Sequence, residues 1–326
     1  MDNNLHASLS DILQKNRIMV IDGSMGTALE ALGCNLNNKL WTAVALDKEP
    51  ELIKQVHTDY FKAGADCGIT CSYQATIPGL MNAGFDEKKA EELITRSVDI
   101  FKEARDEWWI SEGEASGRSY PLCLAAVGPY GAFLADGSEY RGHYAISDGE
   151  LRDFHYRRME LLHNAGADML LIETQPSLRE VCIAAEIAEE LGADYWISFS
   201  CLDGRHINEG DLIRDCAAKL KDGHPHLKMI GVNCTAPKYI AELIDELRSA
   251  CDIPIGVYPN SGETYDAVTK TWHGSADGMS FGDYALSWMQ HGASAVGGCC
   301  QTVAHHIAEV TAAREKFNHT AKKVRY

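Results

Sequence analysis

Short apolar runs alternate with longer amphipathic stretches along most of the chain. The runs are bounded by turn residues, as in buried strands, whereas the stretches between them repeat their apolar residues at helical spacing. Strands are predicted at Ile18–Ile21, Cys67–Cys71, Leu122–Val127, Met169–Ile172, Tyr195–Phe199, Met229–Val232, Ile253–Val257 and Ser294–Val296. Helices are predicted at Pro50–Ala63, Glu87–Trp109, Ser147–Asn164, Leu178–Leu191, Asp211–Lys221, Pro237–Ala250, Phe281–His291 and Val303–Phe317. Strands that alternate with helices in this way form a parallel sheet.

Glycine recurs at one place in this pattern, between the end of a helical stretch and the next apolar run. Gly64, Gly166, Gly192 and Gly292 all lie there, where glycine can end a helix because it accepts a left-handed backbone. No GxGxxG motif follows the first strand, which disfavours a dinucleotide-binding sheet. We therefore predict a single-domain α/β protein, a closed (β/α)8 TIM barrel.

The first and last elements set the limits of this domain. The predicted barrel covers residues 18–317, with an N-terminal segment at 1–17 and a C-terminal tail at 318–326. The N-terminal segment lacks the apolar core of a signal peptide, and no run is long enough to cross a membrane. Eleven cysteines without an export signal indicate a reducing compartment. We expect a cytoplasmic protein.

Composition and charge narrow the function classes. Hydrophobic residues make up 45% of the 326 residues and charged residues 24%, which is ordinary for a globular protein. The formal net charge of −17 excludes nucleic acid and an anionic membrane surface as partners, because both are bound through clustered Lys and Arg.

Three cysteines follow strands that lie close together in such a barrel. Cys234 follows the sixth predicted strand, and Cys299 and Cys300 follow the eighth. Active sites of TIM barrels lie at the carboxyl ends of the strands, so the three thiols can meet across the mouth. Three thiolates around Zn²⁺ leave the fourth tetrahedral position open, which is typical of a catalytic site.

Two other interpretations of the cysteines stay open. Cys299 and Cys300 could be a redox pair, although adjacent cysteines form strained disulfides and the CxxC spacing is absent. Free cysteines also pack as small apolar residues. That is our prediction for Cys34, Cys67, Cys71, Cys123, Cys182, Cys201, Cys216 and Cys251.

Carboxylates and a helix start are predicted on the same face of the barrel. Asp22 and Glu173 follow the first and fourth strands and suit an ammonium group, although Asp22 could instead cap a helix or tie a loop. Gly23 and Ser24 open a helix, whose backbone N–H groups favour a carboxylate. Next to a thiolate-binding metal, these groups suit an amino acid that carries a thiol.

Three long loops on this face carry aromatic residues. They are Cys34–Lys48 with Trp41, Tyr130–Ile146, and Ser261–Ser280 with Tyr265, Trp272 and His273. Long loops at the catalytic end of a barrel usually shape substrate pockets. Aromatic rings together with carboxylates suit a sulfonium or ammonium ion.

Several motifs resemble the homocysteine S-methyltransferase family. They are DGSMGT (Asp22–Thr27), GPYG (Gly128–Gly131), DGSEYRG (Asp136–Gly142), GVNC (Gly231–Cys234), YPNSGE (Tyr258–Glu263) and GGCC (Gly297–Cys300). The resemblance runs from about Ile18 to Arg314. The combination of Asn-Cys with Gly-Gly-Cys-Cys is specific, and nothing departs from it at the metal positions.

The resemblance implies a (β/α)8 barrel that binds Zn²⁺ through Cys234, Cys299 and Cys300, with the homocysteine sulfur as exchangeable ligand. It implies that Asp22 and Glu173 contact the homocysteine amine. The remaining implied positions are Gly23, Ser24 and Asn233 for substrate, and Trp41, Tyr73, Tyr130 and Glu139 for the donor pocket.

The predicted function is transfer of a methyl group from S-methylmethionine, or S-adenosylmethionine, to zinc-bound homocysteine thiolate, giving methionine. The Asp136–Gly142 loop looks like that of members that use S-methylmethionine. The alternatives are a donor such as betaine, a selenocysteine acceptor, and a non-catalytic barrel that binds zinc or thiols. A zinc hydrolase is disfavoured, since three thiolates make zinc a poor Lewis acid.

Overall fold

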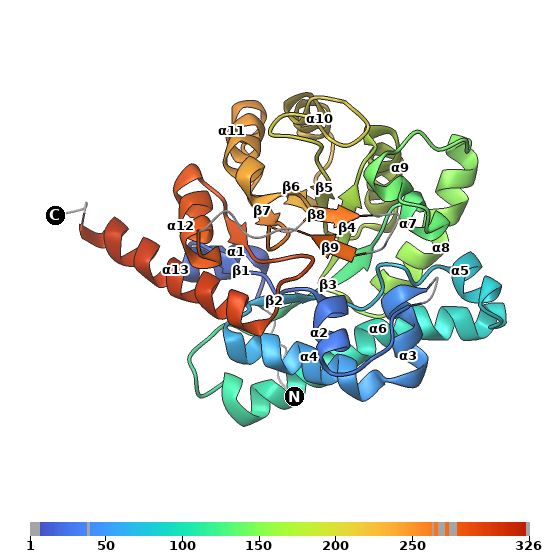
Figure 1. Cartoon of the computed structure of the whole chain (residues 1–326), viewed down its shortest axis with the longest axis horizontal. Coiled ribbons are helices and arrows are strands. Elements are labelled where there is room, and N and C mark those ends of the chain that lie inside the picture. The colour runs from blue at the N-terminus through green and yellow to red at the C-terminus, as the bar shows by residue number, and fades with distance from the viewer. Residues whose placement is uncertain (1–6, 38–39, 263, 267–270, 274–278, 324–326) are drawn as a thin grey trace.

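A computed structural model describes residues 7–37, 40–262, 264–266, 271–273 and 279–323. Eight parallel strands form one nearly closed barrel with helices around its outside (Figure 1), so the predicted single-domain TIM barrel is confirmed. The order around the sheet is β1-β10-β7-β6-β5-β4-β3-β2. The strands are β1 (Met19–Val20), β2 (Cys67–Ile69), β3 (Leu122–Val127), β4 (Met169–Gln175), β5 (Tyr195–Phe199), β6 (Leu227–Asn233), β7 (Ile255–Tyr258) and β10 (Ala295–Val296).

The long helices lie where the sequence predicts them. Helices α4 (Pro50–Ala63), α9 (Leu178–Leu191) and α12 (Phe281–His291) match the predicted bounds at both ends, and each is followed by a glycine with left-handed backbone. The others are α6 (Glu87–Trp108), α8 (Asp148–Asn164), α10 (Ile213–Leu220), α11 (Ile240–Ala250) and α13 (Ala304–Lys323). Of these, α13 continues furthest beyond its predicted end.

Shorter helices lie between the barrel elements. They are α1 (Leu9–Asn16), α2 (Met25–Ala31), α3 (Ala45–Lys48), α5 (Ile77–Asn82), α7 (Tyr130–Leu134), the 3-10 turns η1 (Trp41–Val44), η3 (Ser138–Tyr140) and η4 (Pro237–Tyr239), and the π-helical turn η2 (Trp109–Gly113). Helix α2 is the one expected after Ser24. None of the described helices is long and apolar enough to cross a membrane.

Helix α1 closes the amino-terminal end of the barrel. The Ser8 side chain accepts from the backbone N–H of Asp11, and the Asp11 carboxylate accepts from the N–H of Ser8, which is a capping box. The capped helix turns Ile12 into the barrel, where it is fully buried against inward residues such as Met19 and Met169.

The loop after β7 contains a short antiparallel pair, β8 (Thr264–Asp266) and β9 (Thr271–His273). The side chains of Tyr265, Trp272 and His273, which the sequence places in this loop, lie outside the described part of the structure.

Alternation along the strands separates a helix-facing core from the barrel interior. On β5, Tyr195, Ile197 and Phe199 pack with the helices, while Trp196 belongs to the interior cluster. Trp196 fits there because Gly256 on β7 has no side chain, since a Cβ at that position would overlap the indole ring. The lower half of the interior is therefore apolar.

The same alternation makes the upper half of the interior polar. Inward positions on β4 are Met169 and Leu171, so the next inward residue toward the carboxyl end is Glu173. On β6 the inward Met229 is followed in the same way by Asn233. Both strands thus present polar side chains at the end of the barrel where the long loops lie.

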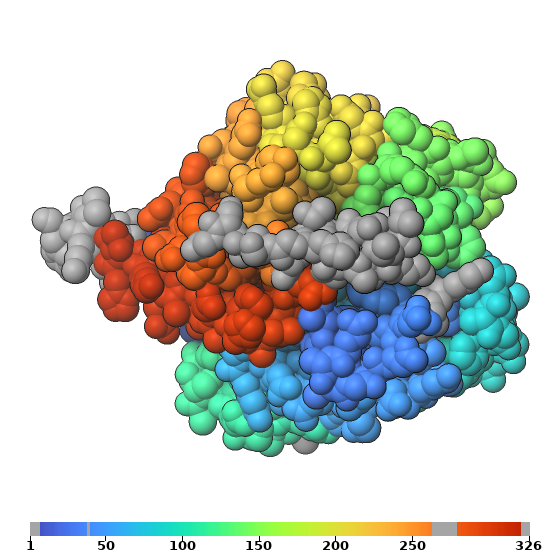
Figure 2. Space-filling model, in the orientation of Figure 1, coloured from blue at the N-terminus to red at the C-terminus, as the bar shows by residue number. Residues whose placement is uncertain are grey.

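Side chains close the seam between the first two strands. Backbone pairing of β1 with β2 is limited to one hydrogen bond among the described residues, from the Asp66 N–H to the Val20 carbonyl. The Asp66 carboxylate accepts from the Val20 N–H over 2.9 Å and pairs with Arg314 of α13. The first and last parts of the chain consequently lie side by side, as Figure 2 shows in blue and red.

Candidate metal and substrate site

Three thiols converge at the carboxyl end of the barrel, as the sequence predicts. The Sγ of Cys299 lies 3.2 Å from that of Cys234 and 3.9 Å from that of Cys300, and Cys234 and Cys300 are 3.5 Å apart. All three side chains are half-buried. Among the described residues, no other set of three or more His, Cys, Asp or Glu side chains is arranged to hold a metal ion.

The backbone brings these cysteines together from two strand ends. Cys234 directly follows β6 and has a left-handed backbone with φ of 49°. Cys299 follows β10, and its N–H donates to the Pro259 carbonyl over 2.7 Å. On the other side, Gly297 lets the end of β10 lie close to the end of β1, because a Cβ at Gly297 would lie 2.5 Å from the Cβ of Ile21.

Mutual hydrogen bonding makes the thiols unequal in the absence of a metal. Donation from the thiols of Cys299 and Cys300 lowers the pKa of Cys234, while sharing a proton with Cys234 raises the pKa of Cys299 and of Cys300. A bound cation would favour the thiolate form of all three. Soft sulfur ligands in this number suit a thiophilic transition metal.

Asn233 ties the cluster to β4 and β5. Its Oδ1 accepts from the Thr174 N–H over 2.9 Å and from the Ser198 hydroxyl over 2.8 Å. Its Nδ2 donates to the Thr174 hydroxyl over 2.8 Å and faces the Cys299 sulfur at 4.0 Å. Thr174 has a φ of 57°, and the pairing of β4 with β5 shifts register there. The hydrogen bonds of Asn233 therefore stabilise the register shift of β4 next to Glu173.

Glu173 is a buried carboxyl group beside the thiols. Burial is the main cause that raises its pKa to about 8, although the Tyr258 hydroxyl, which donates to Oε2 over 3.0 Å, opposes that rise. Cys234 adds to the increase. The site thus holds a carboxyl group that a cation would return to its ionised form.

Asp22 is a second such group, on the opposite side of the barrel. Its Oδ2 accepts from the Ile69 N–H over 2.9 Å, whereas its buried Oδ1 has no partner in the described structure. Burial raises the pKa of Asp22 well above its usual range. Its carbonyl oxygen accepts from the Gly298 N–H over 3.1 Å, which fixes Asp22 next to the cysteine loop.

The start of α2 lies against the same loop. The Ser24 hydroxyl caps the helix by accepting from the Thr27 N–H over 3.1 Å. The Ser24 N–H donates to the Thr302 carbonyl over 3.1 Å, so it is already engaged within the protein. The role of Gly23 and Ser24 in binding a substrate carboxylate stays a prediction. Gly23 lies against Tyr60, whose hydroxyl donates to the Ser24 carbonyl over 2.9 Å.

The loop after β3 brings Glu139 and Tyr140 to the thiols. The Tyr140 hydroxyl lies 3.4 Å from the Sγ of Cys234. Glu139 is half-buried, its Oε2 has no partner in the described structure, and burial raises its pKa to about 7. Cys234 contributes to that rise in pKa, so the carboxyl group is within electrostatic reach of the cysteines.

The other predicted donor residues differ in position. Tyr73 has a pKa raised by burial and then by Glu139 and Cys234, so its hydroxyl lies near the cluster. Trp41 meets Tyr73 edge to face, with ring centroids 6.2 Å apart. The ring of Tyr130 instead lies in an aromatic group with Phe133, Tyr144 and Phe154. The role of Tyr130 in the donor pocket stays a prediction.

Sequence reasoning overlooked two tyrosines of the site. Tyr258 is the last residue of β7 and the hydrogen-bond donor to Glu173, so the strand-end rule could have found it. Tyr140 lies within the motif at Asp136–Gly142, but its approach to Cys234 depends on the fold of a long loop, which has no periodic signal.

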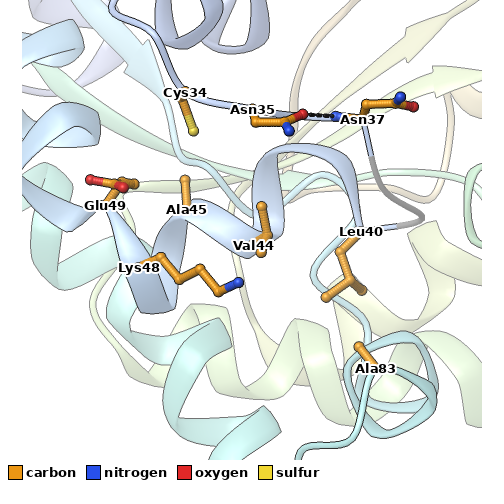
Figure 3. Close-up of a pocket in the computed structure, with 9 residues that line it drawn as sticks. All are labelled: Cys34, Asn35, Asn37, Leu40, Val44, Ala45, Lys48, Glu49 and Ala83. Carbon is orange, nitrogen blue, oxygen red and sulfur yellow. Dashed lines mark hydrogen bonds between the residues drawn. The ribbon is translucent and has the colours of Figure 1, made fainter.

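A cavity of the described structure lies away from the thiols. It has a volume of about 430 Å³ and lies between the chain after α2 and helix α3 (Figure 3). Its lining is Cys34, Asn35, Asn37, Leu40, Val44, Ala45, Lys48, Glu49 and Ala83. None of the three converging cysteines and none of the carboxylates Asp22, Glu139 and Glu173 belongs to it.

Comparison with known proteins agrees with this geometry. The family model described as homocysteine S-methyltransferase matches residues 19–314. Homocysteine S-methyltransferase YbgG of Bacillus subtilis is 50% identical over 305 residues, which cover 93% of this chain and 96% of that protein. Selenocysteine methyltransferase of Astragalus bisulcatus is 41% identical, with 90% of this chain and 92% of that protein covered.

A solved structure is similar to this chain in both fold and sequence. The homocysteine methyltransferase MmuM of Escherichia coli in its metallated form matches with a TM-score of 0.84 and 40% identity, covering 93% of this chain and 99% of that one. The family match spans most of the chain and includes the cysteines at both strand ends. The chain is therefore an enzyme that belongs to the homocysteine S-methyltransferase family.

Proposed function

We propose that the enzyme transfers a methyl group from S-methylmethionine or S-adenosylmethionine to the thiolate of homocysteine, giving methionine, with Zn²⁺ as its metal. The observation that carries the proposal is the convergence of Cys234, Cys299 and Cys300. The relatives named above support the acceptor and the reaction type.

The sulfur positions fit zinc. Sulfurs bound to one tetrahedral Zn²⁺ at ~2.3 Å are separated by about 3.8 Å, and the three distances here range from 3.2 to 3.9 Å. Bound by three cysteines with one position left, Zn²⁺ would keep a substrate thiol deprotonated at neutral pH. No side chain is then needed as a general base.

Homocysteine would be oriented by the two buried carboxyl groups. Asp22 and Glu173 flank the thiols, and Asp22 offers an oxygen without a partner. A substrate ammonium group would lower the raised pKa of either carboxyl group and bind its ionised form. Asn233 has its donors and acceptors engaged by protein groups, so we propose that it positions the site and does not contact substrate.

The donor side would favour a cation. Glu139 lies near the cluster and has an oxygen without a partner in the described structure, and Tyr73 and Tyr140 are close to the same thiols. In the transfer, the homocysteine sulfur forms a bond to the methyl carbon while the bond from that carbon to the donor sulfonium breaks. The leaving sulfur keeps the electron pair and becomes a neutral thioether. A sulfonium therefore loses its charge as it leaves this acidic surface.

A selenol is a second acceptor that deserves assay. The 41% identical relative is a selenocysteine methyltransferase, and a selenolate is a softer ligand than a thiolate for the same kind of site. Selenocysteine would meet the same two carboxyl groups through its ammonium.

Methyl transfer with S-methylmethionine, S-adenosylmethionine and betaine in parallel tests the proposal, with zinc measured on the same sample. We expect fastest turnover with S-methylmethionine and one zinc per chain. Cys234→Ser should lose zinc and activity, whereas Cys251→Ser, at the end of α11, should lose neither. Full zinc and full activity in Cys234→Ser would refute the proposal. Bound zinc without turnover on any of the three donors would contradict the proposed donor and point to an untested alkyl donor.

A further inference from the structure

A buried cluster of charged residues lies behind the loop that carries Glu139 and Tyr140. Arg158 and His155 come from α8, Glu180 comes from α9, and none of the three is more than 1% exposed. Both helices pack against β4. The cluster is therefore outside the barrel wall, beneath the point where the loop leaves β3.

The hydrogen bonds of this cluster have one consistent direction. A guanidinium can only donate, so Nη2 of Arg158 donates to Nδ1 of His155 over 2.8 Å. The ring proton is then on Nε2, which donates to Oε1 of Glu180 over 2.8 Å. Burial, with a smaller contribution from Arg158, lowers the pKa of His155, which agrees with a neutral ring.

Both ends of the cluster bind the backbone at the base of the loop. Nη2 of Arg158 donates to the Gly128 carbonyl, and Oε1 of Glu180 accepts from the Tyr130 N–H over 2.6 Å. Tyr73 also packs directly against Gly128. A Cβ at Gly128 would be 2.6 Å from the Tyr73 carbonyl oxygen and 2.8 Å from the Tyr73 ring. The backbone that the cluster holds thus supports two parts of the donor side.

We propose that Arg158, His155 and Glu180 are positioning residues for the methyl donor. They fix Gly128 to Tyr130, and through this segment they set the places of Tyr73 and of the turn that carries Glu139. The inference rests on the function proposed above, because it assigns the supported side chains to the donor.

Stability alone does not account for this cluster. Here the buried charges of Arg158 and Glu180 are linked only through the neutral ring of His155, and even directly paired buried charges can often be replaced by apolar residues without loss of stability. In the described structure, Nε and Nη1 of Arg158 are buried without partners, which adds a desolvation cost. A requirement to hold the Gly128 carbonyl and the Tyr130 N–H explains why charged side chains are buried in this cluster.

Steady-state kinetics of Glu180→Gln and Arg158→Lys test the inference on zinc-loaded protein. Glu180→Gln keeps the shape of the side chain and removes its charge, and Arg158→Lys keeps the charge and loses the planar fork. We expect the KM for S-methylmethionine to rise about tenfold, as for one lost hydrogen bond to a charged group. The KM for homocysteine and the zinc content should stay within roughly twofold of the unaltered protein, because neither depends on Tyr73 or Glu139.

Asp168→Asn is the matched control. Asp168 lies at the opposite end of the same strands, pairs with the buried Arg105 over 2.9 Å, and accepts from the Cys123 N–H over 2.7 Å. Its loss should lower Tm without changing the ratio of the two KM values. Arg158→Lys keeps the experiment decisive if Glu180→Gln fails to fold.

The possible outcomes separate the two proposals. A selective rise in the donor KM supports positioning by the cluster. An equal rise in both KM values, or a lower Tm with unchanged kinetics as in the control, overturns this inference alone. Lack of turnover by the unaltered protein on every sulfonium donor overturns the proposed function, and this inference with it.

Discussion

Individual polar residues at inward strand positions determine the geometry of the site. Glu173 and Asn233 lie at the last inward positions of β4 and β6, one directly before a residue with left-handed backbone and the other directly before Cys234. Glu173 accepts a hydrogen bond from Tyr258 of β7, and Asn233 accepts one from Ser198 of the neighbouring strand β5. These hydrogen bonds connect the surroundings of the cysteines to β4, β5 and β7.

Asn233→Ala should weaken both folding and metal binding. It would leave the Thr174 N–H and the Ser198 hydroxyl without their acceptor in a buried site, at a cost of ~2–4 kcal/mol. Urea denaturation measures the first effect, and competition with a chelator measures zinc retention. Ser198→Ala, which removes only one of these bonds, should have the smaller effect. Zinc retention equal to that of the unaltered protein would contradict this role.

His57 makes folding sensitive to acid. It is fully buried beside Phe101, both ring nitrogens lack partners in the described structure, and burial lowers its pKa to about 3. The unfolded chain binds a proton near pH 6.5 while the folded protein does not. Stability is therefore complete above pH 6.5 and is lost as pH falls toward 3, by ~2 kcal/mol at pH 5.

His57→Phe should remove this loss. The unfolding free energy of the variant, measured in urea at pH 7 and pH 5, should fall less between the two pH values than that of the unaltered protein. His291→Gln, which alters an exposed histidine paired with Asp245, is the control. Equal pH dependence of His57→Phe and the unaltered protein would show that His57 does not resist protonation.

Among the elements, those with a long periodic pattern could be predicted and short ones could not. The bounds of α4, α9 and α12 follow from amphipathic spacing and a final glycine. The first and last strands have only two residues each, which is too short for a periodic pattern. The short helices of the loops have too few turns for a pattern to emerge.

Helix α1 shows how tertiary contacts can override a polar sequence. Ile12 is the one residue of α1 that is fully buried in the barrel. Ile12→Ala should reduce the unfolding free energy by ~2–4 kcal/mol, as for other large-to-small changes in a core. Gln14→Ala on the exposed side of the same helix should change it by less than ~0.5 kcal/mol. Similar losses for the two variants in urea denaturation would contradict closure of the barrel by α1.

At the scale of the whole molecule, the closed barrel is what makes the site predictable. Cysteines more than sixty residues apart in sequence meet because the strands before them, β6 and β10, both pair with β7. The same closure explains Asp22 opposite Glu173. What the sequence could not supply is the course of the loop that brings Tyr140 to Cys234, since loop conformation depends on contacts such as those of Arg158.

Closure also depends on the last helix. Arg314 of α13 pairs with the buried Asp66, whose carboxylate replaces a strand hydrogen bond at the β1–β2 seam. Arg314→Met should cost ~3 kcal/mol or more, because it leaves a buried charge with less compensation. Arg152→Met, which breaks an exposed pair with Glu190, should cost ~1 kcal/mol or less. Equal costs in urea denaturation would show that the seam does not need α13.

The central claim is that homocysteine binds through its sulfur to a metal held by three cysteines. X-ray absorption at the zinc edge, recorded on the zinc-loaded protein before and after addition of homocysteine, tests it most directly. We predict three sulfur neighbours at ~2.3 Å without substrate and four with it. A sulfur count that stays at three while homocysteine is bound would contradict the account.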